Sequence, residues 1–149
     1  MKTGAKTFIR IIQEATGGLQ TGEIGFGSRI GIVSFATEAT TDAALITSVA
    51  DLNAAVDALT ADGRTNHADA FTKAIQLFDP ASTNQRVIVM FTDGNTTVGL
   101  PPAPIAEAAK SMGIIIYVIG LIGRGGVDVD AITEWASEPK ATQVAVTPN

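Results

Sequence analysis

The sequence predicts a doubly wound, three-layer α/β/α domain, with a mostly parallel sheet and one antiparallel hairpin at its edge. Three stretches, at 29–36, 86–92 and 114–120, are apolar throughout and rich in β-branched residues. Such stretches are typical of strands that helices cover on both faces. They alternate with segments in which apolar residues recur at helical spacing. The length of 149 residues is that of one domain, so we expect a single unit over residues 1–149.

The first part of the chain predicts a helix followed by a hairpin. Apolar residues recur at helical spacing from Ala5 to Ala15, and Gly17-Gly18 ends this helix. A glycine-rich stretch leads to the strand at 29–36. The weaker strand at 40–47 follows a tight connection at 37–38, which indicates an antiparallel partner at the edge of the sheet.

Two helices are expected between the hairpin and the next strand. Ser48 and Asp51 have the spacing of a capping box, which opens the first helix. The loop at 61–65 leads to the second helix, and Asp79-Pro80 ends it. The apolar positions expected to face the core in these two helices are Leu52, Val56, Leu59, Ala68, Phe71, Ile75 and Phe78.

The second half continues the alternation of strands and helices. The strand at 86–92 runs into the turn signal Asp93-Gly94, and Pro101-Pro102 begins a helix that Gly113 ends. The strand at 114–120 is followed by a glycine cluster, a helix and a short last strand at 143–147. The residues expected on the inner faces of these two helices are Ile105, Ala108, Ala109, Met112, Val129, Ile132 and Trp135.

Composition and charge exclude several function classes. The chain has no cysteine, which removes disulfide frameworks, zinc-finger spacings and thiol nucleophiles. A formal net charge of −5 without a Lys/Arg cluster argues against binding to nucleic acid or to an anionic membrane. The longest apolar run, 113–123, is shorter than the roughly 18 residues that span a bilayer, so we expect no membrane insertion. The N-terminal stretch has no apolar segment typical of a secretory signal.

Two oxygen-bearing residues are expected at the carboxyl ends of the strands, where ligands bind in doubly wound sheets. Thr65 precedes a helix and Asp93 follows a buried strand. A hydroxyl and a carboxylate are hard ligands that suit magnesium, manganese or calcium. The alternative is purely structural: Thr65 or Asn66 caps its helix, and Asp93 holds the turn with Gly94.

From Arg29 to Val146 the chain resembles a von Willebrand factor A (vWA) domain, which has a Rossmann-like fold. The matching pieces, in order, are RIGIVSFATEATTDAAL, DGRTNHADAFTKAI, RVIVMFTDGNTT, GIIIYVIGLIG and VDVDAITEWASEPKATQVAVT. The resemblance implies a protein-protein interaction or cell-adhesion module and not an enzyme. It also implies a metal-ion-dependent adhesion site, in which Thr65 and Asp93 match two of the metal ligands. Asn66, Asn95 and Thr96, beside them, are then the expected ligand-binding residues.

The resemblance departs from the family pattern at one important point. The family holds its metal with an additional Asp-x-Ser-x-Ser segment, and this pattern occurs nowhere in the chain. Met1 matches the residue just after that segment, so the domain is expected to be incomplete at its N-terminus, and also at its C-terminus. With only Thr65 and Asp93 as ligands, we expect Mg²⁺, Mn²⁺ or Ca²⁺ to bind no better than about millimolar.

Three further expectations follow from the resemblance. The partner is a protein ligand, reached through a carboxylate that binds the metal, and the location is extracellular or at the cell surface. The family has a strand between those matched by 29–36 and 86–92. Without it, two strand edges keep unpaired backbone groups, which favours self-association unless the two strands pair with each other.

A different class of function stays open as an alternative. The loop at 120–128 joins a strand to a helix, as in a nucleotide- or phosphate-binding α/β enzyme. It lacks the spacing of both Gly-x-Gly-x-x-Gly and the P-loop. His67 is the single histidine, and no Gly-x-Ser-x-Gly elbow accompanies it. We expect His67 on the helix surface, without a catalytic role.

Overall fold

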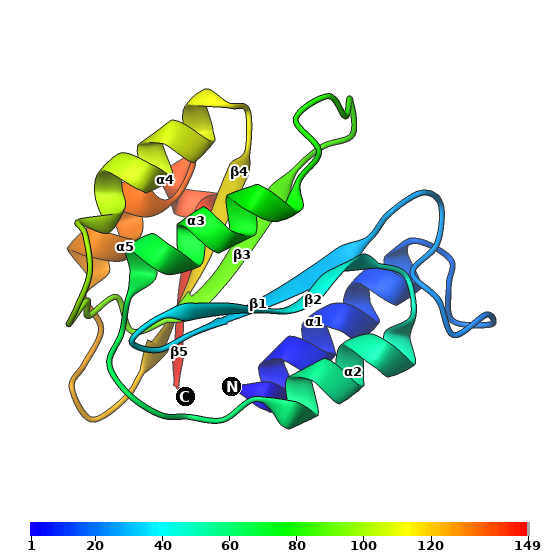
Figure 1. The fold of residues 1–149 in the computed structure, drawn as a ribbon, viewed down its shortest axis with the longest axis horizontal. Coiled ribbons are helices and arrows are strands. Elements are labelled where there is room, and N and C mark those ends of the chain that lie inside the picture. The colour runs from blue at the N-terminus through cyan, green and yellow to red at the C-terminus, as the bar shows by residue number, and fades with distance from the viewer. Residues whose placement is uncertain (149) are drawn as a thin grey trace.

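The computed structural model describes residues 1–148 and has alternating helices and strands (Figure 1). The elements in chain order are α1 (Lys2–Ala15), β1 (Ile30–Phe35), β2 (Ala39–Ile46), α2 (Val49–Ala58), α3 (His67–Leu77), β3 (Val87–Thr92), α4 (Pro102–Ser111), β4 (Ile115–Ile122), α5 (Val129–Trp135), α6 (Lys140–Gln143) and β5 (Val144–Pro148). The strands agree with the predicted ones to within two residues at each end. The short helix α6 is not predicted by the sequence pattern.

The fold class is confirmed, with one difference in how the strands pair. Strands β3, β4 and β5 form a parallel sheet in the order β3-β4-β5. Strands β1 and β2 form an antiparallel hairpin, whose tight connection has the Ala36 N–H donating to the Glu38 carbonyl over 2.9 Å. Within residues 1–148 no bridge joins the hairpin to the parallel sheet. β1 and β3 therefore do not pair with each other, and each keeps one unpaired edge.

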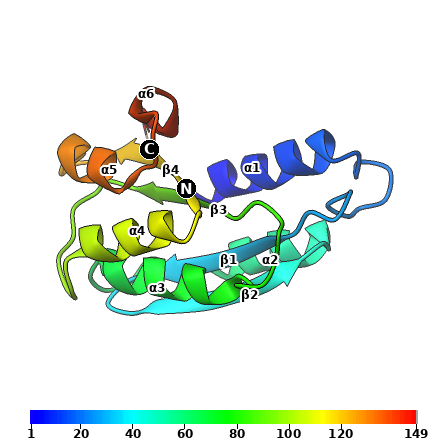
Figure 2. The ribbon, with the colours of Figure 1, turned by 90° about the horizontal axis from the view of Figure 1, so that it is seen from above.

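Helices lie on both sides of the parallel sheet. Seen from above, α3, α4 and the hairpin of β1 and β2 lie on one side of β3 and β4, and α6 lies on the other (Figure 2). One cluster of buried side chains joins the parallel sheet to α3, α4 and α5, around Phe71, Ile116 and Trp135. A smaller cluster joins α1, α2 and the hairpin, around Leu52 and Val56. The first cluster also includes Ala39 of β2, with Val33 and Phe35 of β1 packed against it, so the hairpin contributes to both clusters.

The predicted helix ends are largely confirmed. The Ser48 side chain accepts a hydrogen bond from the Asp51 N–H over 3.2 Å at the start of α2. Pro102 occupies the first position of α4, where its missing N–H costs no helical hydrogen bond. Gly113 adopts a φ of 81° after that helix, a conformation that glycine takes without steric strain.

Two of the predicted helix faces are wrong in detail. In α4 the buried residues are Ala106 and Ala109, whereas Ala108 is exposed and Met112, which caps the end of the helix, is 44% exposed. In α5, Ile132 and Trp135 are buried as predicted, but Val129 is 49% exposed. Val129 is the first residue of its helix, so it precedes the turn that packs into the core. Helical spacing identifies an apolar stripe but does not fix how the helix ends meet their neighbours.

Candidate functional site

The loops that carry Thr65 and Asp93 meet at the carboxyl end of β3, where the loop at 120–128 joins them. The Thr65 N–H donates to the Thr97 hydroxyl over 2.8 Å, and the Thr97 N–H donates to the Thr65 carbonyl over 3.0 Å. The Asp128 N–H donates to the Asp93 carbonyl over 2.8 Å. Loop 92–97 is thus hydrogen-bonded both to loop 61–66 and to loop 120–128. The sequence predicted that the first two, which carry Asp93 and Thr65, lie at the same end of the sheet.

Thr65 has its backbone engaged and its side chain available. Its carbonyl also accepts a longer hydrogen bond, of 3.3 Å, from the Val98 N–H. No hydrogen bond within residues 1–148 engages the Thr65 hydroxyl. The capping role falls to its neighbour Asn66, whose side-chain oxygen accepts from the Asp69 N–H over 3.0 Å. Asn66, and not Thr65, is therefore the residue that caps α3.

Asp93 holds the turn and still presents one carboxylate oxygen. Its Oδ1 accepts from the Asn95 N–H over 2.9 Å, which fixes the turn through Gly94. A Cβ atom on Gly94 would lie 2.8 Å from the Ile132 side chain and 2.9 Å from the Asp128 carbonyl, so only glycine fits there. Oδ2 of Asp93 has no hydrogen-bond partner in the described part of the chain. The structural role of Asp93 thus leaves one oxygen for a ligand.

The remaining candidate side chains take part in hydrogen bonds of the loops themselves. Asn66 also donates from Nδ2 to the Thr37 carbonyl over 3.1 Å, so both ends of its amide are engaged. The Asn95 amide lies 3.4 Å from the Asp93 carbonyl. The Thr96 hydroxyl pairs with the ring of His67 over 2.8 Å. These contacts order the rim around Asp93.

His67 is not on the helix surface, as its sequence position had suggested, but fully buried. Its Nε2 lies 2.6 Å from the Thr92 hydroxyl, and its Nδ1 reaches the Thr96 hydroxyl. The ring packs between Phe35 and Trp135, with centroids 5.2 and 4.7 Å away. Burial at the start of α3 results from these partners on β1, α5 and the loop after β3, none of which is near His67 in sequence.

Burial lowers the pKa of His67 from 6.5 to about 4, although the nearby Asp93 carboxylate acts in the opposite direction. The imidazole is therefore neutral at physiological pH, with one nitrogen as donor and the other as acceptor. A buried ring that bonds two threonines is unsuited to proton transfer with a ligand in solvent. His67 has a structural place in the site, as do Thr92 and Thr97, which the sequence analysis missed. The sequence feature that could have indicated them is the group of threonines around Asp93-Gly94.

The donor set suits only a hard cation that keeps most of its water. Within residues 1–148, no three His, Asp or Glu side chains cluster as a metal centre. The Thr65 hydroxyl and Asp93 Oδ2 are both oxygen donors of the kind that magnesium, manganese and calcium prefer. Two protein oxygens are few for such an ion, because tight sites supply more. The two side chains offer a hydroxyl and a carboxylate oxygen, groups that can form hydrogen bonds or coordinate a hard cation.

The alternative prediction, a nucleotide- or phosphate-binding enzyme, depends on the glycine cluster in the loop at 120–128. This cluster forms a tight turn of its own. The Gly126 N–H donates to the Gly123 carbonyl over 3.1 Å, and the two glycines form an isolated bridge. This N–H therefore points into the turn instead of toward a ligand. The geometry does not favour a phosphate-binding loop at 120–128.

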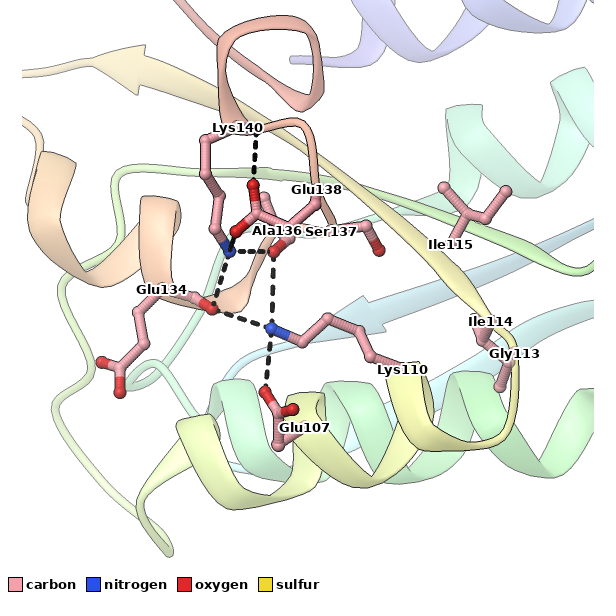
Figure 3. Close-up of a pocket in the computed structure, with 10 residues that line it drawn as sticks. All are labelled: Glu107, Lys110, Gly113, Ile114, Ile115, Glu134, Ala136, Ser137, Glu138 and Lys140. Carbon is pink, nitrogen blue, oxygen red and sulfur yellow. Dashed lines mark hydrogen bonds and ion pairs between the residues drawn. The ribbon is translucent and has the colours of Figure 1, made fainter.

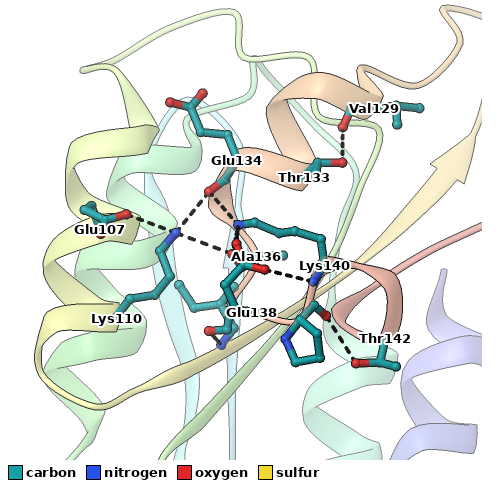
Figure 4. Close-up of polar contacts among 12 residues, drawn as sticks. Glu107, Lys110, Val129, Thr133, Glu134, Ala136, Glu138, Lys140 and Thr142 are labelled. Atoms are coloured by element: carbon teal, nitrogen blue, oxygen red, sulfur yellow. Dashed lines mark hydrogen bonds and ion pairs between the residues drawn. The ribbon is translucent and has the colours of Figure 1, made fainter.

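A cavity of about 650 Å³ lies at the other end of the sheet (Figure 3). Lys110 from α4 and Lys140 from α6 meet there over the carbonyl groups that end α5 (Figure 4). Lys110 Nζ lies 3.0 Å from the Glu134 carbonyl and 3.1 Å from the Glu107 carboxylate. Cations at a helix C-terminus stabilise the last carbonyls. Both ammonium groups already have partners, so neither is free to bind an anionic ligand in the cavity.

Comparisons with known proteins show the family and the fold of the chain. The sequence model of the von Willebrand factor type A domain matches residues 3–149. No curated protein matches the chain closely enough in sequence to count as a relative. None of the helices in residues 1–148 combines the length and the apolar character needed to cross a membrane.

Several solved structures share the fold at low sequence identity. Proximal thread matrix protein 1 from the mussel byssus is 24% identical, with a TM-score of 0.78; the match covers 99% of this chain and 37% of that one. A second structure of the mussel protein has a zinc-occupied MIDAS motif, and is 23% identical with a TM-score of 0.76, over 95% of this chain and 36% of that one.

Two more structures come from microbial proteins. The vWF domain of the type V pili tip protein Mfa5 from Porphyromonas gingivalis is 12% identical, with a TM-score of 0.81, over 99% of this chain and 81% of that one. The manganese-loaded TRAP protein of Plasmodium vivax is 17% identical, with a TM-score of 0.66, over 81% of this chain and 53% of that one. At these identities the likeness is one of fold. The chain spans little more than a third of the length of the mussel protein.

Proposed function

The chain belongs to the von Willebrand factor type A domain family, and from this we propose that it is a protein-binding module and not an enzyme. Its contact surface would be the edge of the sheet where the loops of Thr65, Asp93 and Asp128 meet. Domains of this family typically act in adhesion or protein interaction, which supports the proposal. The observation that carries it is the pair of oxygens at this edge, the Thr65 hydroxyl and Asp93 Oδ2, left without partners among the described residues.

The finer part of the proposal is a partial metal-ion-dependent adhesion site. Thr65 and Asp93 would hold Mg²⁺, Mn²⁺ or Ca²⁺ together with several waters, at an affinity no better than about millimolar. A carboxylate of a protein partner would then complete the ion's shell. Support comes from the donor chemistry and from related folds, of which one is described with a zinc-occupied MIDAS motif and another as manganese-loaded.

The residues around the ion would meet the partner. We assign this role to Asn95 and Thr96, which lie in the loop beside Asp93, and to Asn66 at the start of α3. Thr96 is exposed, so its backbone is within reach of a partner. The Asn66 side chain would contribute through the shape of the loop, because both ends of its amide are already bonded.

Titration of Mn²⁺ against the protein by calorimetry tests the metal site. We expect weak binding to the wild type and none to Asp93→Ala or Thr65→Ala. Glu14→Ala is the matched control, since it removes an exposed carboxylate at the far end of α1 and should leave binding unchanged. Equal binding to Asp93→Ala and to the wild type would contradict the proposed site.

Self-association through strand edges is a separate part of the proposal. β1 and β3 each have one unpaired edge in the described chain, and both strands carry only apolar, glycine, serine or threonine residues. Unprotected edges of this composition favour pairing with another chain. Light scattering after size-exclusion chromatography should detect dimers that increase with concentration. A strictly monomeric protein over a wide concentration range would contradict this part.

We also propose an extracellular or cell-surface location. Support comes from the pilus tip protein that shares the fold, and from a Bacteroides fragilis neighbour described as an aerotolerance-related membrane protein. Labelling of the intact source cells with a reagent that does not cross the membrane would test it. A protein labelled only after cell lysis would count against this location.

A further inference from the structure

The buried histidine connects the two halves of the proposed site. His67 is the first residue of α3 and follows Thr65 by two positions. Its ring nitrogens reach Thr92 and Thr96, which stand on either side of Asp93 in sequence. One side chain therefore binds both ends of the segment that carries Asp93, and it does so from the helix that follows Thr65.

The ring itself has little freedom to move. Phe35 of β1 and Trp135 of α5 pack against it at interplanar angles of 50° and 46°. Phe71 of α3 in turn packs edge-on against Trp135, with centroids 5.8 Å apart. Packing fixes the ring plane, and the ring plane fixes the directions in which the two nitrogens point. The hydrogen bonds to the threonines are therefore directed by the core.

Thr92 also holds the backbone of the turn that carries Asp93. The Thr92 hydroxyl also accepts from the Gly94 N–H over 3.1 Å, so the hydroxyl that meets His67 holds the backbone of the turn as well. Two positions later, Asp93 Oδ1 holds the Asn95 N–H. A contiguous set of contacts thus runs from the ring to the carboxylate of Asp93.

We propose that His67 is the positioning residue of this site: it holds the Asp93 loop against Thr65, so that the two free oxygens face one cation. The inference rests on the proposed metal site, but the loop geometry can be tested without a metal. Groups that orient metal ligands through hydrogen bonds typically contribute about 10- to 100-fold to metal affinity. His67 does not touch the ion; it acts through Thr92 and Thr96.

Two variants remove the hydrogen bonds between His67 and the threonines, and the threonine variant also removes the acceptor of the Gly94 N–H. His67→Phe keeps a ring between Phe35 and Trp135 but cannot bond either threonine. The double variant Thr92→Val with Thr96→Val keeps the histidine and removes both hydroxyl groups, and it serves if the phenylalanine variant fails to fold. Thr72→Val is the matched control, because the Thr72 hydroxyl bonds only to the Ala68 carbonyl within α3.

The metal-free measurement is amide hydrogen exchange, followed by NMR. The Asn95 and Thr97 amides bond to Asp93 and Thr65, so they report the geometry of the loop. We expect both variants to lose about tenfold or more of the protection at these amides, relative to amides in the centre of β4. The control should keep the protection of the wild type. Unchanged protection at both amides in the folded variants would overturn the proposal.

Mn²⁺ titration on the same proteins adds the functional measurement. A loss of affinity of about 10- to 100-fold in both variants, with none in the control, is the expected result. His67→Gln keeps one donor and one acceptor and should recover part of the affinity. Increased exchange with unchanged Mn²⁺ affinity would overturn the positioning role. A wild type that binds no Mn²⁺ would overturn the proposed metal site, and the exchange result alone would then decide whether His67 holds the loop.

Discussion

The buried histidine makes the stability of the domain depend on pH in a direction that can be worked out. The pKa of His67 falls from 6.5 in an unfolded chain to about 4 in the folded protein, chiefly because of burial. Between these two values the unfolded chain binds a proton that the folded protein does not. The free energy of unfolding therefore rises with pH through this window, and the contribution is complete above the unfolded pKa.

The size of the effect follows from the two pKa values. This difference between the folded and unfolded pKa of His67 corresponds to about 3 kcal/mol of unfolding free energy in total. Roughly 2 kcal/mol of it should appear between about pH 4.5 and pH 7. This is a large part of the stability of a small domain.

Urea denaturation followed by circular dichroism at several pH values measures the effect. His67→Gln does not titrate in this range, so it serves as the reference, and carboxylates common to both proteins cancel in the difference. As the pH rises from about 4.5 to 7, we expect the free energy of unfolding of the wild type to increase by roughly 2 kcal/mol more than that of His67→Gln. Parallel profiles for the two proteins would refute the assignment of His67 as a buried, neutral imidazole.

Three substitutions test local features of the fold by thermal or urea denaturation. Gly99→Ala should destabilise the domain by about 1–3 kcal/mol, because Gly99 has a φ of 93° and a Cβ there would lie 2.3 Å from Asn66 Oδ1; a neutral effect would contradict this packing. Ser48→Ala should cost about 1 kcal/mol through loss of the α2 cap, and Ser48→Asp should not. Ile116→Ala should cost about 2–5 kcal/mol, since Ile116 is fully buried, and a loss below about 1 kcal/mol would show a looser core.

Local sequence signals were sufficient for most of the elements. β-Branched apolar runs marked β1, β3 and β4, since such strands are covered on both faces whatever their neighbours are. Ser48 and Pro102 marked helix starts because capping depends on residues within one turn. The short α6 carries no such pattern. Its four residues contain no buried side chain, so no apolar periodicity accompanies it.

The candidate site was only partly predictable. The order of strands and helices was enough to bring the loops of Thr65 and Asp93 together, because Asp93 follows strand β3 and Thr65 precedes the helix that runs back to the start of that strand. The sequence did not predict which of these side chains takes part in the hydrogen bonds of the loops. Asn66 became the cap and Thr65 kept a free hydroxyl, although both types of residue cap helices.

By itself, the sequence determined the alternation of strands and helices, the family and the end of the sheet at which the loops of Thr65 and Asp93 lie. These depend on residue spacing, which is local. Only the tertiary structure decided that the hairpin stands apart from the parallel sheet and that His67 is buried. The partners of His67 lie 25 and 29 residues away at Thr92 and Thr96, and its ring is covered by Phe35 and Trp135. Contacts between such distant residues arise from packing, and no local pattern records them.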